Sequence, residues 1–301
     1  MKRNNLVRVR TLGALGALAV AAAGCGNSAA PHSGGAVVKA SHAKALKIIP
    51  APANTLGATA PQTNGTLWAV AGNAKSHGIY QMDLSNHKVI GSLSVSNTAS
   101  TIVESPTGLV ALGMATPSTG AVEFRNGSSG SLLATVPLSG PVVALAAGVD
   151  GSTFYALNGH PGNMAIDIIN SQKGSIETSL PAPSNAVSVV PAPNEQSVYV
   201  LQTNGVVSQI ATTGGHIATQ FPIGHSGRAL AIGSGGNTLY VLKGQGSVRN
   251  VAVVNIPTES VKTVLPAPSN TKNVALSPNG KELYDVVGAP GIGDIQAFAV
   301  P

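Results

Sequence analysis

A short apolar segment, usually with an aromatic second residue, recurs six times along the chain at an almost constant interval. The copies lie at residues 67–70, 109–112, 154–157, 198–201, 239–242 and 283–286. Their second residues are 42, 45, 44, 41 and 44 positions apart, and only the second copy, with Val110, lacks the aromatic. A period of about 40–50 residues built from short strands is typical of propeller blades. The repeat therefore predicts an all-β fold made of similar blades.

A second marker follows the same period. Apolar stretches that end in Pro, or in Ser at one copy, fall at residues 49–50, 93–94, 136–137, 180–181, 221–222 and 265–266. Between two markers the chain has the pattern of four short strands, predicted in one repeat at 186–190, 197–202, 206–211 and 216–221. Asn-Gly and Gly-Gly pairs lie between these segments, and they suit tight hairpin turns because they tolerate a positive φ.

The two ends of the chain predict a closed ring. The last repeat stops one strand short, while residues 45–52 (ALKIIPAP) are similar to residues 260–268 (SVKTVLPAP) of the preceding repeat. An N-terminal strand that completes the last blade would close the ring and leave few open sheet edges. Six blades of about 43 residues fit the span 43–301, whereas seven would need about 300 residues. We therefore predict a single β-propeller of six four-stranded blades, with seven blades as the alternative.

The first 25 residues are typical of an export signal. Residues 1–10 carry four basic residues and no acid, and residues 11–23 are an apolar run that ends just before Gly24 and Cys25. This run is shorter than the ~20 residues of a transmembrane helix. The segment ending in Cys25, the chain's one cysteine, resembles a bacterial lipobox, although Ala22 stands where that pattern prefers Leu. The alternative is a plain secretory signal with Cys25 removed or incidental.

This interpretation divides the chain into a lipoprotein signal peptide (1–24), a Gly-, Pro- and Ser-rich flexible tether (25–42) and a propeller domain (43–301). It places the protein on the outer face of the bacterial cytoplasmic membrane, attached through lipidated Cys25. It also removes the apparent basicity, because 17 Lys and Arg against 11 Asp and Glu become 13 against 11 once residues 1–10 are lost. No basic run remains, so nucleic-acid binding is not expected.

Several segments resemble the repeats of YVTN-type β-propellers. Residues 277–284 (SPNGKELY) are similar to the family's "SPDGKRLYV" segment, with further copies at 150–155 and 235–240. Residues 165–170 (AIDIIN) and the turn 171–174 are similar to its "VSVIDTATG" strand. The resemblance covers residues 43–301. It implies the propeller fold but no particular activity, because structural repeats define the family.

Candidate ligand-binding residues are few. Propellers bind ligands where loops converge at the mouth of the central channel, which directs attention to Asp285, His225, Glu104 and Glu195. Asp285 interrupts an apolar strand, and the other three lie near predicted inner strands. Convergence of two or more of them at one mouth would favour a channel-metal lactonase or hydrolase, and their separation would count against it. Asp83 and His87 fall in a predicted turn, where a spacing of four gives no shared face.

The sequence shows no catalytic constellation. One cysteine cannot supply a C-x-x-C-H haem attachment, no Gly-x-Ser-x-Gly elbow joins a strand to a helix, and the Gly-rich residues 288–293 link two predicted strands. We therefore predict a monomeric, non-catalytic binding or scaffold protein with no cofactor and no metal. Its expected partners are the membrane, through the lipid anchor, and an envelope protein, glycan or small ligand. A lactonase or hydrolase is the first alternative, and a cofactor-binding relay domain is the second.

Overall fold

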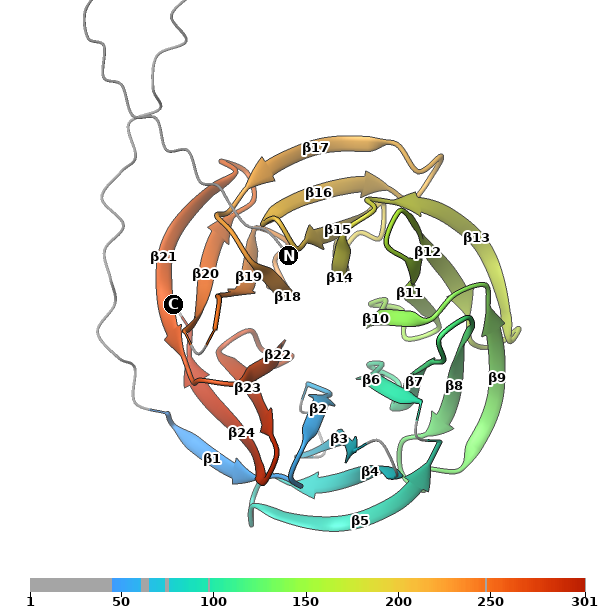
Figure 1. The fold of residues 1–301 in the computed structure, drawn as a ribbon, viewed down its shortest axis with the longest axis vertical. Helices are drawn as coiled ribbons and strands as arrows, with labels where there is room; N and C mark the ends of the chain where they lie inside the picture. Colours follow the sequence, from blue (N-terminus) through green and yellow to red (C-terminus); the bar gives the residue numbers. More distant parts are fainter. Residues whose placement is uncertain (1–44, 61–64, 74–75, 97, 247, 301) are drawn as a thin grey trace, which may run out of the picture. The chain divides into compact units, whose positions relative to one another are not determined.

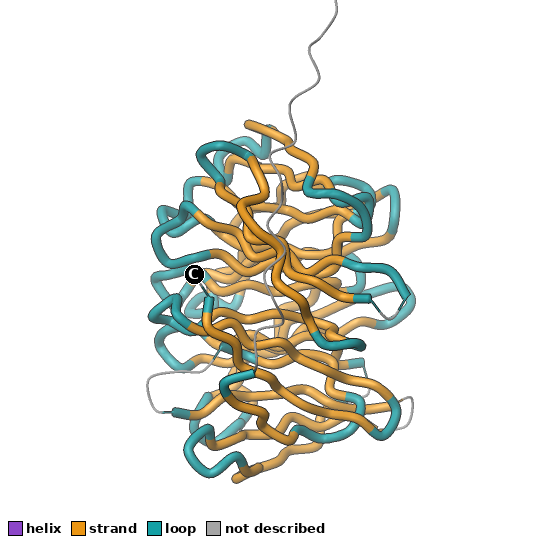
Figure 2. The backbone as a smooth tube through the Cα atoms, turned by 90° about the vertical axis from the view of Figure 1, so that its left-hand side faces the viewer, coloured by secondary structure: helices purple, strands orange, loops and turns teal. Residues whose placement is uncertain are grey.

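The computed structural model describes residues 45–60, 65–73, 76–96, 98–246 and 248–300. These residues form 24 strands in six four-stranded sheets, which stand as blades around a common centre (Figure 1). All regular structure in this part of the chain is β (Figure 2), so no described segment is a helix able to cross a membrane. The predicted six-bladed propeller is confirmed, and the seven-bladed alternative is wrong. The predicted signal peptide (1–24) and tether (25–42) lie outside the described residues.

Each blade runs from an inner strand at the centre of the ring to an outer strand at its rim. The inner strands are β2 (Thr55–Ala58), β6 (Ala99–Glu104), β10 (Val142–Ala147), β14 (Ala186–Pro191), β18 (Gly227–Ile232) and β22 (Thr271–Leu276). The second strands are β3 (Thr66–Asn73), β7 (Leu109–Ala115), β11 (Thr153–His160), β15 (Ser197–Gln202), β19 (Thr238–Lys243) and β23 (Glu282–Ala289). The third strands are β4 (Ser76–Asp83), β8 (Gly120–Asn126), β12 (Asn163–Asn170), β16 (Val206–Ala211), β20 (Arg249–Asn255) and β24 (Ile292–Ala299). The outer strands are β5 (Lys88–Val95), β9 (Leu132–Leu138), β13 (Ser175–Ala182), β17 (Ile217–Pro222), β21 (Ser260–Ala267) and β1 (Lys47–Pro50).

We number the blades 1 to 6 in the order of their inner strands, from β2 to β22. Blade 6 combines both ends of the described chain, because β1 pairs antiparallel with β24 in the order β1-β24-β23-β22. Ile49 of β1 lies opposite Ile295 of β24 and is fully buried beside Leu67 of blade 1. The predicted closure by an N-terminal strand is therefore confirmed.

A β-bulge occurs at the same place in every blade. The pairing of each inner strand with its second strand skips one residue near the start of the inner strand, between Thr55 and Gly57 in blade 1 and between Ala99 and Thr101 in blade 2. Such bulges locally increase the strand twist. Counting from the bulge gives the structural alignment of the six blades.

This alignment corrects the sequence repeat by one residue in blade 2. Val103 pairs with Ala111, just as Ala146 pairs with Tyr155 in blade 3, so Ala111 and not Val110 occupies the aromatic position. Phe124, which pairs with Ala111, supplies the missing ring and packs edge-on against Phe154 of blade 3, with ring centroids 4.9 Å apart. In blade 2 the aromatic side chain is therefore on the neighbouring strand. A search for sequence repeats cannot detect this substitution of one strand for another.

The core consists of six apolar clusters, one for each interface between neighbouring blades. Between blades 3 and 4, for example, Tyr155 and Leu157 pack against Val198 and Val200. Both faces of a blade are therefore buried, one against each neighbour, so the second strands are apolar throughout rather than alternating. Apolar burial between blades is the main stabilising contribution in this arrangement.

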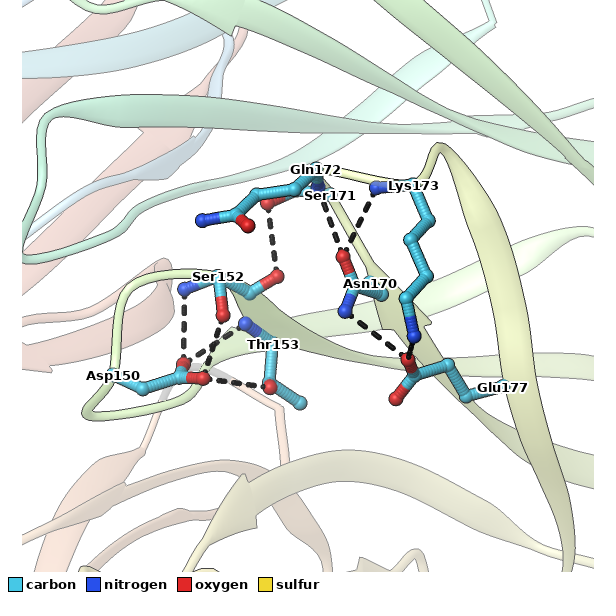
Figure 3. Close-up of polar contacts among 8 residues, drawn as sticks. All are labelled: Asp150, Ser152, Thr153, Asn170, Ser171, Gln172, Lys173 and Glu177. Carbon is cyan, nitrogen blue, oxygen red and sulfur yellow. Dashed lines mark hydrogen bonds and ion pairs between the residues drawn. The ribbon is translucent and has the colours of Figure 1, made fainter.

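The ring has two faces. Because all blades share one strand order, their inner strands begin on the same face, here called the start side, and end on the other, the end side. Asx turns shape the end side (Figure 3). In blade 3 a carboxylate oxygen of Asp150 accepts hydrogen bonds from the amides of Ser152 and Thr153, each at 2.9 Å, and the Asn170 side chain accepts one from the Lys173 amide at 3.0 Å. Partial burial alone would raise the pKa of Asp150, but these bonds and those from the two hydroxyls lower it to about 2.

Candidate functional site in the central channel

A cavity of about 570 Å³ lies at the centre of the ring and is lined by residues of all six inner strands. Its volume is within the range of about 300–1,000 Å³ that is common for ligand sites. Each inner strand is the last strand of its sheet and pairs on one side only, so its other backbone edge faces the channel. Such an edge presents N–H and C=O groups that no neighbouring strand satisfies. The wall therefore combines aliphatic side chains with backbone polar groups.

Only three of the described residues that line the cavity are charged. Two of them, Arg228 and Lys272, lie on the start side, and Glu104 ends β6 on the end side. The remaining lining residues are mostly Ala, Val, Leu, Ile and Pro. A ligand in the channel would thus meet positive charge at one mouth and one carboxyl group at the other.

Arg228 and Lys272 occupy the same structural position on neighbouring blades. Both are the bulged residue, which is second in its inner strand, and both are exposed at the mouth. The other four blades carry uncharged residues there: Leu56, Ser100, Val143 and Val187. The Nε of Arg228 donates a 2.9 Å hydrogen bond to the carbonyl of Gly244, which holds the guanidinium against the β19–β20 loop.

Glu104 is nearly buried, with 8% of its surface exposed. The hydroxyl of Thr59, on the adjacent blade 1, donates a 3.5 Å hydrogen bond to Glu104 Oε2 and accepts a 3.0 Å bond from the Trp68 amide. Burial raises the pKa of Glu104 to about 7, and the bond from Thr59 only partly offsets this. The sequence prediction therefore located a residue that does border the channel, and its charge changes near neutral pH.

Asp285 lies away from the channel. It occupies the position held by Ala69, Leu112, Ala156, Val200 and Val241 in the other blades, all of them in interblade clusters. Its neighbour two positions away, Leu283, packs into the cluster between blades 5 and 6, and residues two apart share one face of a strand. Asp285 is 1% exposed, and its Oδ1 has no hydrogen-bond partner within the described chain. The expectation that Asp285 lies at the channel mouth is wrong.

Glu195 and His225 lie on opposite sides of the ring. Glu195 is in the β14–β15 turn on the end side, where its Oε1 accepts a 2.5 Å hydrogen bond from the amide of Val149 on blade 3 and so links two blades. His225 is exposed in the β17–β18 loop on the start side and does not line the cavity. Of the four candidates, only Glu104 borders the channel.

The four residues therefore form no common site. Within the described ranges, no three or more His, Cys, Asp or Glu side chains lie close enough together to hold a metal ion. Asp83 and His87 belong to a turn, as predicted: Asp83 Oδ1 accepts a 2.7 Å hydrogen bond from the Ser85 amide, and His87 has a φ of 58°.

Sequence reasoning missed Arg228 and Lys272. The only available signal was a cation at the first residue of one predicted inner strand, 228–233, and another just before the next, 273–277. That signal is uninformative until the bulge is known, because the bulge decides which residue meets the channel mouth.

The comparisons with known proteins support the fold alone. The sequence matches no family model and no curated protein. Among solved structures, the chain is similar to the Kuenenia stuttgartiensis hydrazine synthase, with a TM-score of 0.63 and 15% sequence identity over 82% of this chain and 83% of that one. At this identity the likeness confirms a propeller and carries no inference about activity.

Proposed function

We propose that the protein is a lipid-anchored, extracytoplasmic β-propeller of YVTN type that binds a ligand in its central channel without converting it chemically. The observation that carries this proposal is the cavity that all six blades line, with cations at one mouth and a single carboxyl group at the other. A rigid ring that brings parts of six repeats to one cavity is well suited to recognition.

The separation of the candidate residues supports a binding role. General acid–base catalysis needs groups positioned within hydrogen-bonding reach of the same reacting atoms. Glu104 borders the channel, whereas Glu195 bonds a neighbouring turn and Asp285 is buried between blades. No observation on these residues favours a lactonase or hydrolase.

Channel binding is tested by narrowing one mouth. Val143 is 39% exposed and lines the cavity on the start side, so Val143→Trp adds bulk there with little effect on the core. A thermal-shift screen of sugars, sugar acids and short peptides on the full chain, followed by calorimetry, identifies a ligand. We expect Val143→Trp to weaken its binding at least tenfold. The matched control is Ile90→Trp, on the rim strand β5 and 52% exposed, which leaves binding unchanged. Equal binding by both variants would contradict the proposal.

The anchor requires its own test. The basic start, the apolar run and Cys25 support export followed by lipidation. In a bacterial host we expect the wild-type chain in the membrane fraction and Cys25→Ser in the soluble extracytoplasmic fraction. Intact-mass analysis should show the added acyl groups on a chain that begins at Cys25. An unmodified wild-type chain would favour the plain secretory signal.

A further inference from the structure

The start side of the ring is positively charged around the channel mouth. Its charged residues within the described chain are Arg228, Lys243, Arg249, Lys272 and Asp294. The four cations all belong to blades 5 and 6, and Arg228 and Lys272 line the cavity itself. Asp294 lies farther out, on the third strand of blade 6, where it pairs with Pro50 of the outer strand. The positive charge is therefore concentrated on one arc of the mouth.

No acidic side chain neutralises this arc in the described structure. The two ion pairs between described residues, Arg125–Glu123 and Lys173–Glu177, belong to blades 2 and 3. The Nζ of Lys243 donates a 2.7 Å hydrogen bond to the carbonyl of Ile223, so part of its hydrogen-bonding capacity is already used. Unpaired cations that line a concave site attract anions, because the low-dielectric wall screens their charge less than bulk water does.

Arg249 strengthens the charge at this mouth. Its Nε is buried without an acceptor among the described residues, although buried donors are nearly always hydrogen-bonded. Burial, and then the like charge of Arg228, lower the pKa of Arg249. The Nη1 of Arg249 donates hydrogen bonds to the carbonyls of Gly246 and Val248, at 2.6 and 3.0 Å, which hold its guanidinium in the β19–β20 loop beside the mouth.

We propose that Arg228 and Lys272 bind the carboxylate or phosphate of a small anionic sugar whose uncharged ring enters the channel; this rests on the proposed channel-binding function. Arginine matches the planar or tetrahedral oxygens of such groups with several donors, and lysine adds a point charge. The two residues hold equivalent positions on adjacent inner strands, and both line the cavity.

The channel wall favours a ligand with hydroxyl groups over a hydrocarbon. The inward-facing backbone edges present both donors and acceptors, and covering them with a purely apolar chain would leave them unsatisfied. A hydroxyl group donates one hydrogen bond and accepts others, so a sugar ring satisfies both kinds. One hydroxyl of the wall already accepts such a bond: Ser188 Oγ accepts a 3.0 Å hydrogen bond from the amide of Leu230 on the next blade.

The test uses the full chain, purified in detergent, and four matched probes measured by calorimetry at low salt. Glucuronate and glucose 6-phosphate carry both the anion and the ring, glucose carries only the ring, and inorganic phosphate carries only the anion. We expect the two sugar anions to bind most tightly and to weaken with added salt. Arg228→Ala and Lys272→Ala should each weaken this binding about tenfold or more. Lys281→Ala, an exposed cation on the end side, is the control and should change nothing.

The outcomes separate this inference from the proposed function. In one outcome glucose binds as tightly as glucose 6-phosphate, and its binding is blocked by Val143→Trp but unaffected by Arg228→Ala. This result would support channel binding and overturn the anion site. In another outcome phosphate binds as tightly as the sugar anions, and its binding is unaffected by Val143→Trp. This result would show a surface anion site and overturn the sugar assignment. Absence of binding by all four probes at 10 mM overturns the inference, and the ligand screen described above then decides the proposed function independently.

Discussion

Asn158 donates a 2.7 Å hydrogen bond from its Nδ2 to Oδ2 of Asp167 in the interior of blade 3. Ser179 adds a 2.5 Å hydrogen bond to the other carboxylate oxygen, so Asp167 is buried with both oxygens satisfied. Asp285 is equally buried in blade 6, but its Oδ1 has no partner in the described chain. The two buried aspartates therefore differ in whether their carboxylate oxygens are hydrogen-bonded.

Replacing the two aspartates should shift stability in opposite directions. Asp285→Val restores the residue found at the equivalent Val200 and Val241, and removes a carboxylate that is buried without a counter-charge. We expect it to raise the free energy of unfolding by about 2 kcal/mol at pH 8. Asp167→Val should lower it by about 2–3 kcal/mol, because two donors lose their acceptor. Urea denaturation of both variants is the measurement, and destabilisation by both would refute the distinction.

Stability should fall as the pH rises from about 4 to about 8. Burial raises the pKa of Asp285 and of Glu104 to about 7 in the folded protein, so the folded state holds more protons than the unfolded state in this interval. The loss reaches completion above both folded pKa values; the two shifts correspond to about 4 kcal/mol for Asp285 and about 3 kcal/mol for Glu104, the second reduced because its carboxyl borders the channel. Urea midpoints at pH 5, 6.5 and 8 measure it. The double variant Asp285→Asn, Glu104→Gln should flatten the profile, and an equally steep profile would show that other groups are responsible.

The closing strand β1 should contribute measurably to stability. Ile49 is fully buried between blades 6 and 1, whereas its neighbour Ile48 is 51% exposed. We expect Ile49→Ala to lower the free energy of unfolding by about 2–4 kcal/mol, because it removes buried methylene groups and leaves a cavity. Ile48→Ala is the matched control and should change it by less than about 0.5 kcal/mol. Equal effects in thermal denaturation would mean that β1 does not hold the ring closed.

A glycine at the junction of blades 6 and 1 should be irreplaceable. A Cβ on Gly288 would lie 1.8 Å from the carbonyl oxygen of Thr55, a backbone atom that cannot move without shifting the inner strand of blade 1. We expect Gly288→Ala to cost about 2–4 kcal/mol. Gly235, which has open space around its Cβ position and no positive φ, is the control. Thermal melts compare the two variants, and a tolerated Gly288→Ala would show that the blades separate here at little cost.

The sequence by itself determined the architecture. The period near 44 residues, the turn residues between strands and the similarity of residues 45–52 to 260–268 predicted six blades and their closure. These features are local: strand length, turn chemistry and repeat spacing are written in contiguous segments, and every blade obeys the same rules. The predicted strands 186–190, 197–202, 206–211 and 216–221 match β14 to β17 to within one residue at each end.

Only the tertiary structure decided which residues form the site. A one-residue change of register turns a strand's side chains to the other face, and neither the repeat nor the composition shows where each bulge falls. The bulge placed Arg228 and Lys272 at the channel mouth, and the register of β23 directed Asp285 between blades. In blade 2 the ring that Ala111 lacks comes from Phe124 on the next strand. Whether a side chain of a blade lies in the channel or between two blades depends on how neighbouring blades pack against each other. This packing exists only in the closed ring.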